Sequence, residues 1–119
     1  MNLQTDVNGF LDLVRKGQFM DAFEKYYSED VVMQENNDPP KVGKTQNRTA
    51  EKEFLDSVEA VHETQIKNVA FDPNKNVVMI QEYMDLTLKG MGRVKMEEIA
   101  VQTWRDGKIV EERFFYNRQ

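Results

Sequence analysis

Cysteine is absent from this chain of 119 residues, and histidine and tryptophan each occur once. Without cysteine there can be no disulfide framework, no thiolate nucleophile and no cysteine-ligated zinc. The lone His62 provides too few imidazoles for a transition-metal site, which usually takes more than one imidazole or thiolate. No glycine-rich phosphate loop occurs either, because Gly90-Met91-Gly92 lacks the following helix that such a loop needs. We therefore expect neither a metal nor a cofactor.

Positive charge is in deficit, with 16 basic residues against 21 acidic residues and a net charge of −5. That sign argues against nucleic acid as a partner, because phosphate binding needs a basic face. No stretch approaches about 18 apolar residues, so we expect no membrane span. The first residues, M-N-L-Q-T-D-V, lack the basic region and apolar run of a signal peptide, so a cytoplasmic location is the expectation.

Apolar residues in the first half of the chain recur at helical spacing. This periodicity predicts helices over residues 6–16, 18–27 and 45–60. The third helix places Phe54 on its apolar face and Glu51 on the opposite face, which we expect to be solvated. The first helix has Thr5 or Asp6 as its candidate N-cap.

The second half of the chain changes to a period of two, which is typical of strands. Strands are predicted over 31–35, 64–71, 77–88, 93–105 and 108–116, with a proline-containing loop at 36–40. Helices followed by an antiparallel meander predict one α+β domain over residues 1–119, with the helices packed on one sheet face.

The last two strands flank Asp106-Gly107, the strongest short-range signal for a hairpin with a type I′ turn. A two-residue turn fixes the register, so Arg105 opposes Lys108 and Thr103 opposes Val110. One face then holds Ile99, Val101, Thr103, Val110, Glu112, Phe114 and Tyr116, and we assign this more apolar face to the helix side.

The other face of the hairpin carries Trp104, Ile109, Arg113 and Phe115. Exposed aromatic side chains beside an arginine suggest a partner surface, and a homodimer is its simplest form. In the alternative interpretation, Arg113 covers the aromatic side chains and no partner binds.

Two carboxylates interrupt apolar faces. Glu82 lies among the apolar residues of strand 77–88, and Glu112 lies in the apolar face of the hairpin. A lone buried carboxylate is costly, so each either forms a pair or has a raised pKa. Such interruptions are typical of a pocket.

The order of these features resembles a known group of proteins. Two short helices around Gly17 precede Y-Y-S-E-D-V-V-M-Q-E-N, a proline loop, V-G-K and a third helix, and W-R-D-G-K-I-V-E-E-R-F-F-Y closes the chain. This pattern is similar to the SnoaL-like branch of the nuclear-transport-factor-two-like, or ketosteroid isomerase-like, superfamily. The resemblance implies a cone-shaped, strongly bent sheet wrapped by three helices, a cystatin-like α+β barrel with a pocket inside the cone.

A comparison with ketosteroid isomerase, a member of that superfamily, concerns single residues. The general-base position matches Glu35, a carboxylate. The two oxyanion-hole positions match Phe10 and a residue near Ile99 or Ala100, which have no side-chain donor. The resemblance therefore implies an acid/base residue without the isomerase oxyanion hole.

These observations predict a site whose candidate catalytic residues are Glu35, Glu82 and Glu112. The candidate ligand-binding residues are Tyr27, Asn36, Phe54, Val101, Phe114 and Tyr116. We expect the cone to bind an apolar or aromatic small molecule and to catalyse cofactor-free proton transfer. A non-catalytic ligand-binding or dimerisation module, in which the carboxylates are structural, is the alternative.

Overall fold

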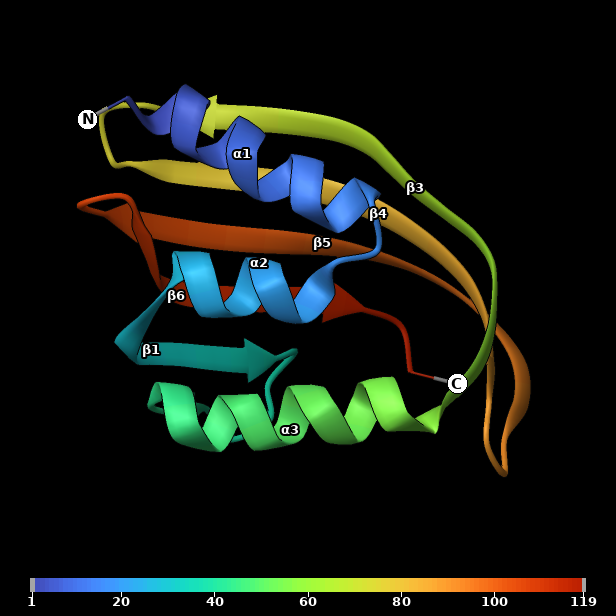
Figure 1. Ribbon diagram of the computed structural model, residues 1–119. Coiled ribbons are helices and arrows are strands. Elements are labelled where there is room, and N and C mark those ends of the chain that lie inside the picture. The colour runs from blue at the N-terminus through green and yellow to red at the C-terminus, as the bar shows by residue number, and fades with distance from the viewer. Residues whose placement is uncertain (1, 119) are drawn as a thin grey trace.

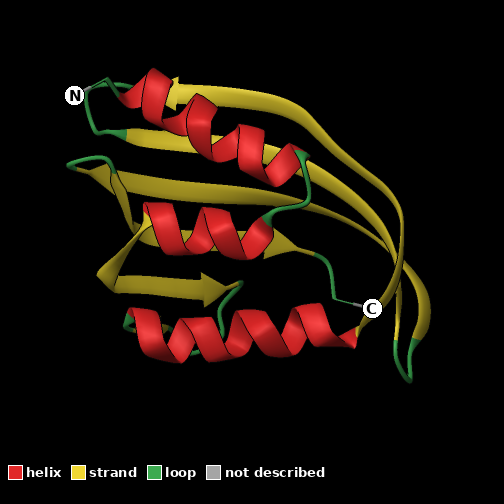
Figure 2. Cartoon of the chain, in the orientation of Figure 1, coloured by secondary structure: helices red, strands yellow, loops and turns green. Residues whose placement is uncertain are grey.

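Three helices lie across one face of a twisted sheet in the computed structural model, which describes residues 2–118 (Figure 1). The helices are α1 (Leu3–Arg15), α2 (Phe19–Tyr26) and α3 (Lys44–Ser57). The strands are β1 (Tyr27–Glu35), β2 (Lys41–Val42), β3 (Val58–Asp72), β4 (Val77–Leu88), β5 (Gly92–Arg105) and β6 (Lys108–Tyr116). The predicted α+β class is confirmed, and short loops connect most of the elements (Figure 2).

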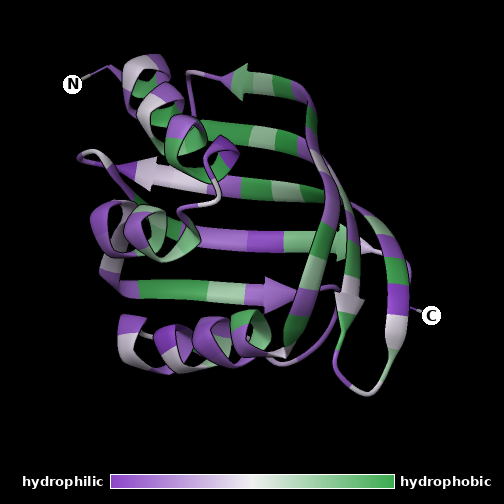
Figure 3. Ribbon diagram, turned by 45° about the vertical axis from the view of Figure 1, so that its right-hand side comes forward, coloured by the Kyte–Doolittle hydropathy of each residue, from purple (hydrophilic) through white to green (hydrophobic). Residues whose placement is uncertain are grey.

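The sheet has the strand order β2-β1-β6-β5-β4-β3 and does not close on itself. Strands β1 and β6 run parallel, and the other neighbouring strands run antiparallel. The long strands β3, β4 and β5 bend at one end of the sheet, and bands of hydrophilic and hydrophobic residues alternate along the bent part (Figure 3). Strand β3 contains three register shifts in its pairing with β4. Because such bulges bend a strand and increase its twist, they help to give the sheet its cone shape.

The ends of two helices differ from those that the sequence predicts. Helix α1 begins at Leu3 because the Asn2 side chain, rather than Thr5 or Asp6, caps it, with Asn2 Oδ1 accepting a hydrogen bond from the Thr5 backbone nitrogen at 3.1 Å. Helix α3 ends at Ser57 rather than near residue 60. The β-branched Val58 instead starts β3 and pairs with Leu88 of β4, so tertiary pairing overrides the helical pattern.

An aromatic cluster anchors α1 and α2 to the sheet. The ring of Phe10 lies 5.9 Å from that of Tyr26 and 6.0 Å from that of Trp104, both edge-on. Tyr26 and Trp104 also meet, at 5.8 Å. Edge-to-face aromatic pairs at these separations stabilise a core beyond the area that they bury.

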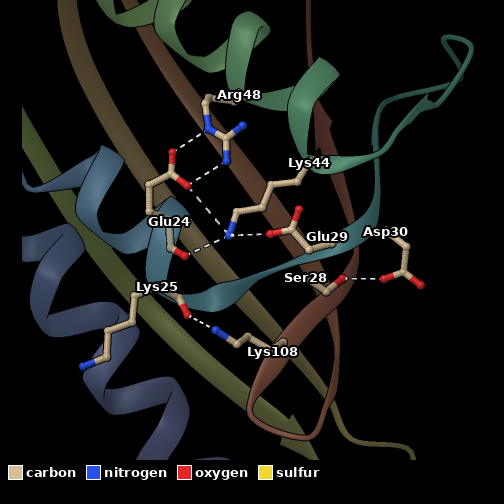
Figure 4. Close-up of polar contacts among 8 residues, drawn as sticks. All are labelled: Glu24, Lys25, Ser28, Glu29, Asp30, Lys44, Arg48 and Lys108. Atoms are coloured by element: carbon tan, nitrogen blue, oxygen red, sulfur yellow. Dashed lines mark hydrogen bonds and ion pairs between the residues drawn. The ribbon is translucent and has the colours of Figure 1, made fainter.

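Helix α3 is held against α2 by Lys44 and Arg48 (Figure 4). Lys44, which is 5% exposed, donates from Nζ to the backbone oxygen of Glu24 at 2.8 Å. Its amine also lies 3.8 Å from the Glu24 carboxylate and 4.0 Å from that of Glu29. Arg48 donates two hydrogen bonds to the same Glu24 carboxylate, at 2.6 and 2.8 Å. These contacts fix the helix that covers one side of the cone.

The hairpin turn forms where the sequence predicts it, with φ of 53° at Asp106 and 76° at Gly107. The predicted register holds only for the first pairs. Thr103 is opposite Glu111 rather than Val110, because a β-bulge inserts one extra residue into β6. A shift of one residue moves the following pairs by one position. Glu112 is therefore opposite Gln102 on the helix side of the sheet.

The predicted faces of β5 are consequently reversed. Trp104 and Ile109, which we assigned to a partner surface, are 3% and 0% exposed and lie under the helices. Val101, which we assigned to the pocket, alternates with the buried Ala100 and Gln102 and so lies on the outer face. In β6 the prediction is wrong for Ile109, which precedes the bulge, and correct beyond it, since Glu112 and Phe114 lie on the inner side, against the cavity.

Candidate functional site

A cavity of about 330 Å³ opens between the three helices and the inner face of the sheet. Its apolar lining consists of Phe10, Val14, Phe19, Ala22, Phe23, Met33, Phe54, Leu55, Met84, Met96 and Phe114. Its polar lining consists of Tyr27, Glu35, Glu51, Glu82, Glu98, Glu112 and Tyr116. The volume and the mostly apolar walls with a few polar groups are typical of a small-molecule site.

The structure brings seven of the nine predicted site residues to this cavity. They are Tyr27, Glu35, Phe54, Glu82, Glu112, Phe114 and Tyr116. Asn36 and Val101 do not line it. Whether any of the seven binds a ligand or takes part in a reaction stays a prediction.

Glu112 is a buried carboxyl at the end of a hydrogen-bond chain, and it is 2% exposed. Tyr27 Oη donates to Glu112 Oε1 at 2.5 Å, and Gln102 Nε2 donates to Glu112 Oε2 at 2.5 Å. Trp104 Nε1 in turn donates to Gln102 Oε1 at 3.0 Å, which orients the Gln102 amide. Burial raises the pKa of Glu112 to about 8, although the two donated hydrogen bonds act in the lowering direction.

Glu82 and Glu98 form a second acidic group in the cavity, directly opposite each other on β4 and β5. Burial raises the pKa of Glu82, and the neighbouring Glu98 raises it further. Burial raises the pKa of Glu98 too, in opposition to its hydrogen bond with Glu82. Two carboxyls held this close cannot both ionise easily, so the pair shares a proton near neutral pH.

Two further carboxylates lie closer to the mouth of the cavity. Glu35 at the end of β1 accepts a hydrogen bond from Tyr116 Oη at 3.1 Å and is exposed. Glu51 of α3 is half-buried, and burial followed by the charge of Glu35 raises its pKa. The expectation that Glu51 belongs to a solvated helix face is therefore wrong.

Asn36 stabilises the end of β1 rather than the cavity wall. Its backbone has φ of 50°, and its side-chain Oδ1 accepts a hydrogen bond from the Tyr116 backbone nitrogen at 2.9 Å. Its backbone oxygen accepts from Arg113 Nε at 3.0 Å. Asn36 thus joins β1 to β6 and helps to position Glu35 and Tyr116. It does not line the cavity, where the sequence analysis had placed it.

The sequence interpretation missed Glu51, Glu98 and Gln102. Glu98 and Gln102 lie on the face of β5 that a bulge-free register turns away from the helices. The signal that could have found Glu98 is its place opposite Glu82 in the β4–β5 pairing, because two carboxylates facing each other across strands destabilise a sheet unless they have a role.

Within residues 2–118, no group of three or more histidine, aspartate or glutamate side chains has an arrangement that could hold a metal ion. In the same part of the chain, none of the helices is long and apolar enough to cross a membrane.

Comparisons with known proteins show which family and which solved structures this chain resembles. A family model described as the SnoaL-like domain matches residues 1–116. A candidate SnoaL-like polyketide cyclase from Mesorhizobium loti is 28% identical with a TM-score of 0.88, and the match covers 98% of this chain and 100% of that chain. A candidate isomerase from Bacillus subtilis is 19% identical with a TM-score of 0.80, covering 98% of this chain and 90% of that chain.

A protein of unknown function with a cystatin-like fold from Xanthomonas campestris is 16% identical with a TM-score of 0.82, covering 100% of this chain and 93% of that chain. The proteins from Xanthomonas campestris and Bacillus subtilis are only 16% and 19% identical to this chain, so their likeness to it shows the fold alone. No curated protein sequence matches the chain. Because the family model extends over nearly the whole length, the chain belongs to the SnoaL-like domain family.

Proposed function

We propose that this protein binds a small apolar or aromatic molecule in the cavity and catalyses a cofactor-free proton transfer on it, of the isomerase or cyclase type. The observation that carries the proposal is the Glu82–Glu98 pair, which faces an apolar cavity on adjacent strands. The name of the similar protein from Mesorhizobium loti, a candidate SnoaL-like polyketide cyclase, supports a reaction of this class.

The Glu82–Glu98 pair has the chemistry that proton transfer needs at neutral pH. When two carboxyls share one proton, one is a general base and the other is a general acid at the same time. The base would take a proton from a carbon next to a carbonyl group, and the acid would return a proton to another atom of the same substrate. The apolar walls exclude water, which strengthens both interactions.

The other carboxyls would have supporting roles. Glu112 would act as a fixed dipole, because Tyr27 and Gln102 hold both of its oxygens. Glu35 at the mouth, held by Tyr116, stays a second candidate base. Phe10 lines the cavity at a position where ketosteroid isomerases have a donor, so steroid isomerisation is not the reaction that we propose.

Exchange of carbon-bound hydrogen for deuterium tests the reaction without knowledge of the natural substrate. A panel of small aromatic ketones is incubated with the protein in heavy water, and the exchange beside the carbonyl is followed by NMR. Glu82→Gln and Glu98→Gln should each lower the catalysed rate by about 100-fold, the usual contribution of a positioned acid or base. Glu97→Gln is the matched control, because Glu97 is exposed and binds Lys67 instead.

Equal exchange rates in the wild type and in a Glu82→Gln, Glu98→Gln double variant would show that the pair takes no part in the reaction.

The second candidate function is a non-catalytic ligand-binding module. It is favoured by Glu112, whose oxygens are both engaged within the protein. Saturable ligand binding without any catalysed exchange across the ketone panel would support this second function.

A further inference from the structure

The hydrogen-bond chain that ends at Tyr27 has a fixed direction. An indole N–H can only donate, so the contact of 3.0 Å between Trp104 Nε1 and the Gln102 amide must be made to the amide oxygen. The Gln102 amide nitrogen therefore faces Glu112 Oε2, at 2.5 Å. An amide nitrogen also only donates, so Glu112 Oε2 accepts this bond and carries no hydrogen of its own. When the Glu112 carboxyl is neutral, its proton is consequently on Oε1, beside Tyr27.

Glu112 is neutral at neutral pH because of its surroundings. The side chain is 2% exposed, and the two groups bonded to it, Tyr27 and Gln102, are uncharged. A buried carboxyl without a cationic partner avoids the cost of an isolated charge by keeping its proton. The pKa of about 8 to which burial raises Glu112 agrees with this argument. The charged groups that act on it from other elements are also acidic, namely Glu82 of β4, Glu98 of β5 and Glu51 of α3.

Protonation of Glu112 releases the hydrogen of Tyr27. Tyr27 Oη lies 2.5 Å from Glu112 Oε1, and a hydroxyl can accept as well as donate. Tyr27 is the donor when Glu112 is ionised. When Glu112 Oε1 carries the proton, Glu112 becomes the donor, and the Tyr27 hydrogen turns to the other side of its oxygen. Burial, followed by the charge of Glu112, raises the pKa of Tyr27, so the tyrosine keeps this hydrogen.

The released hydrogen has no acceptor in the protein. Within the described part of the chain, Glu112 is the hydrogen-bond partner of the Tyr27 hydroxyl, and Tyr27 lines the cavity. The tyrosine ring is held in place, because it stacks on Phe23 with 4.8 Å between ring centres and meets the tilted ring of Phe10 at 6.1 Å. The hydroxyl is therefore a preorganised donor, and its acceptor is expected to come from a molecule in the cavity.

We propose that Tyr27 donates this hydrogen to a carbonyl oxygen of the bound molecule, and that Glu112 is the positioning residue that makes the hydrogen available. The proposal rests on the proposed function, because it names the residue that binds the carbonyl group of the substrate. When the base removes a proton from the carbon beside the carbonyl, the C–H electron pair forms a C=C bond and the C=O π pair moves onto the oxygen. The Tyr27 hydrogen bond stabilises the negative charge that develops there, and the hydrogen stays on Tyr27.

The donor depends on the protonation state of Glu112. As the pH rises through the pKa of Glu112, about 8, the carboxylate accepts the Tyr27 hydrogen again and the ligand oxygen loses its donor. Glu112→Gln should remove this dependence. Its amide oxygen can accept from Gln102 while its amide nitrogen donates to Tyr27, which is the bonding pattern of the protonated carboxyl. A Tyr27 hydroxyl that only supports Glu112 structurally predicts no such behaviour.

Two probes of the same shape test the hydrogen bond. They are acetophenone, labelled at its carbonyl carbon, and its hydrocarbon isostere α-methylstyrene, in which a methylene group replaces the oxygen. NMR titration measures both affinities, and the chemical shift of the labelled carbon reports the hydrogen bond. We expect Tyr27→Phe to weaken acetophenone binding about threefold to tenfold, to leave α-methylstyrene binding unchanged, and to move the carbon shift toward its value in an apolar solvent.

Tyr26→Phe is the matched control for this substitution. Tyr26 is the neighbouring tyrosine and is also buried, but it does not line the cavity. Loss of its hydroxyl should change neither the two affinities nor the carbon shift. Thermal unfolding verifies that both variants fold.

A pH series identifies the role of Glu112. In the wild type, the preference for acetophenone over α-methylstyrene should fall about threefold to tenfold between about pH 6.5 and about pH 9.5, and in Glu112→Gln it should stay constant. Glu82 and Glu98 also have raised pKa values, so the Glu82→Gln, Glu98→Gln double variant is measured in parallel. This double variant should keep the pH dependence of the wild type.

Catalysed deuterium exchange of acetophenone provides a second measurement. Tyr27→Phe should lower kcat about 100-fold with a smaller change in KM, because the hydrogen bond strengthens as charge develops on the oxygen. A residue with only a structural role would not separate kcat from KM in this way.

The outcomes distinguish this proposal from the proposed function. An unchanged carbon shift in Tyr27→Phe, or a preference that falls with pH in Glu112→Gln as it does in the wild type, would overturn the role of Tyr27 while exchange by Glu82 and Glu98 stands. A carbon shift that depends on Tyr27, without any catalysed exchange, would support the donor and reject the reaction. If acetophenone does not bind, the donor is overturned, and the exchange measured across the ketone panel decides the reaction separately.

Discussion

Glu112 shows what one buried carboxyl does to the stability of the whole chain. Its pKa is about 8 in the folded protein, against an ordinary value of 4.5. At a pH below 4.5, both the folded and the unfolded state hold the proton of this carboxyl. At a pH between 4.5 and about 8, only the folded state holds the proton, so the free energy of unfolding falls as the pH rises. Glu82, Glu98 and Glu51 act in the same direction, because their pKa values are also raised.

We therefore expect the free energy of unfolding to decrease from about pH 5 to about pH 8.5, by an amount on the order of a few kcal/mol. Urea unfolding across this range measures it. Glu112→Gln should show a smaller decrease, since a glutamine has no proton to lose. Glu111→Gln is the control, because Glu111 is exposed on the same strand. Parallel pH curves for the wild type and Glu112→Gln would contradict the expectation.

At the scale of elements, the junction between α2 and α3 depends on one buried amine. Lys44→Ala removes the hydrogen bond to the Glu24 backbone oxygen and the cation that lies between two glutamates. The loss of a charge-assisted hydrogen bond should lower the free energy of unfolding by about 2 kcal/mol. Chemical denaturation measures the change, with Lys52→Ala on the exposed part of α3 as a control. A Lys44→Ala protein as stable as the control would show that the junction does not need the amine.

The elements themselves could largely be predicted from the sequence. Hydrophobic period identifies α1, α2 and β4, and Asp106-Gly107 identifies the hairpin, because a type I′ turn demands positive φ at both residues. The two-residue strand β2 could not be predicted, since it is defined by pairing with β1 rather than by its own pattern. The end of α3 was predicted too late because Val58 suits a helix and a strand alike in a local window.

The candidate site could be predicted only in part, and one residue is the reason. The extra residue at Val110 has no local signature, yet it changes which side of the sheet the pairs beyond it share. The prediction placed Glu112 correctly and its neighbours on β5 incorrectly, so it included Val101 and missed Glu98. Glu51 was missed because a helical wheel alone cannot show that the polar side of α3 faces a cavity.

At the scale of the whole molecule, the outer face of the sheet carries large apolar side chains that are exposed. Phe115 is 43% exposed with the Arg113 guanidinium 4.8 Å from its ring centre, and Met79 is 49% exposed. We propose that this face, centred on Arg113 and Phe115 and without Trp104, pairs two copies of the chain. Apolar side chains grouped on a sheet face are typical of such contacts.

Sedimentation velocity tests this pairing. The wild type should sediment as two chains, and Phe115→Glu should shift it to one chain, because a charge would have to be buried at the contact. Met91→Glu, in the exposed turn between β4 and β5, should leave the mass unchanged. A wild type that sediments as one chain at high concentration would rule the pairing out.

The hydrogen-bond chain behind Glu112 also makes the molecule its own spectroscopic probe. Trp104 is the only tryptophan in the sequence, and its indole N–H reaches Glu112 through Gln102. A change in the charge of Glu112 alters the electric field along this chain, and indole fluorescence responds to such fields. Occupancy and titration of the cavity can thus be followed by intrinsic emission, with no label and no second tryptophan to obscure the signal.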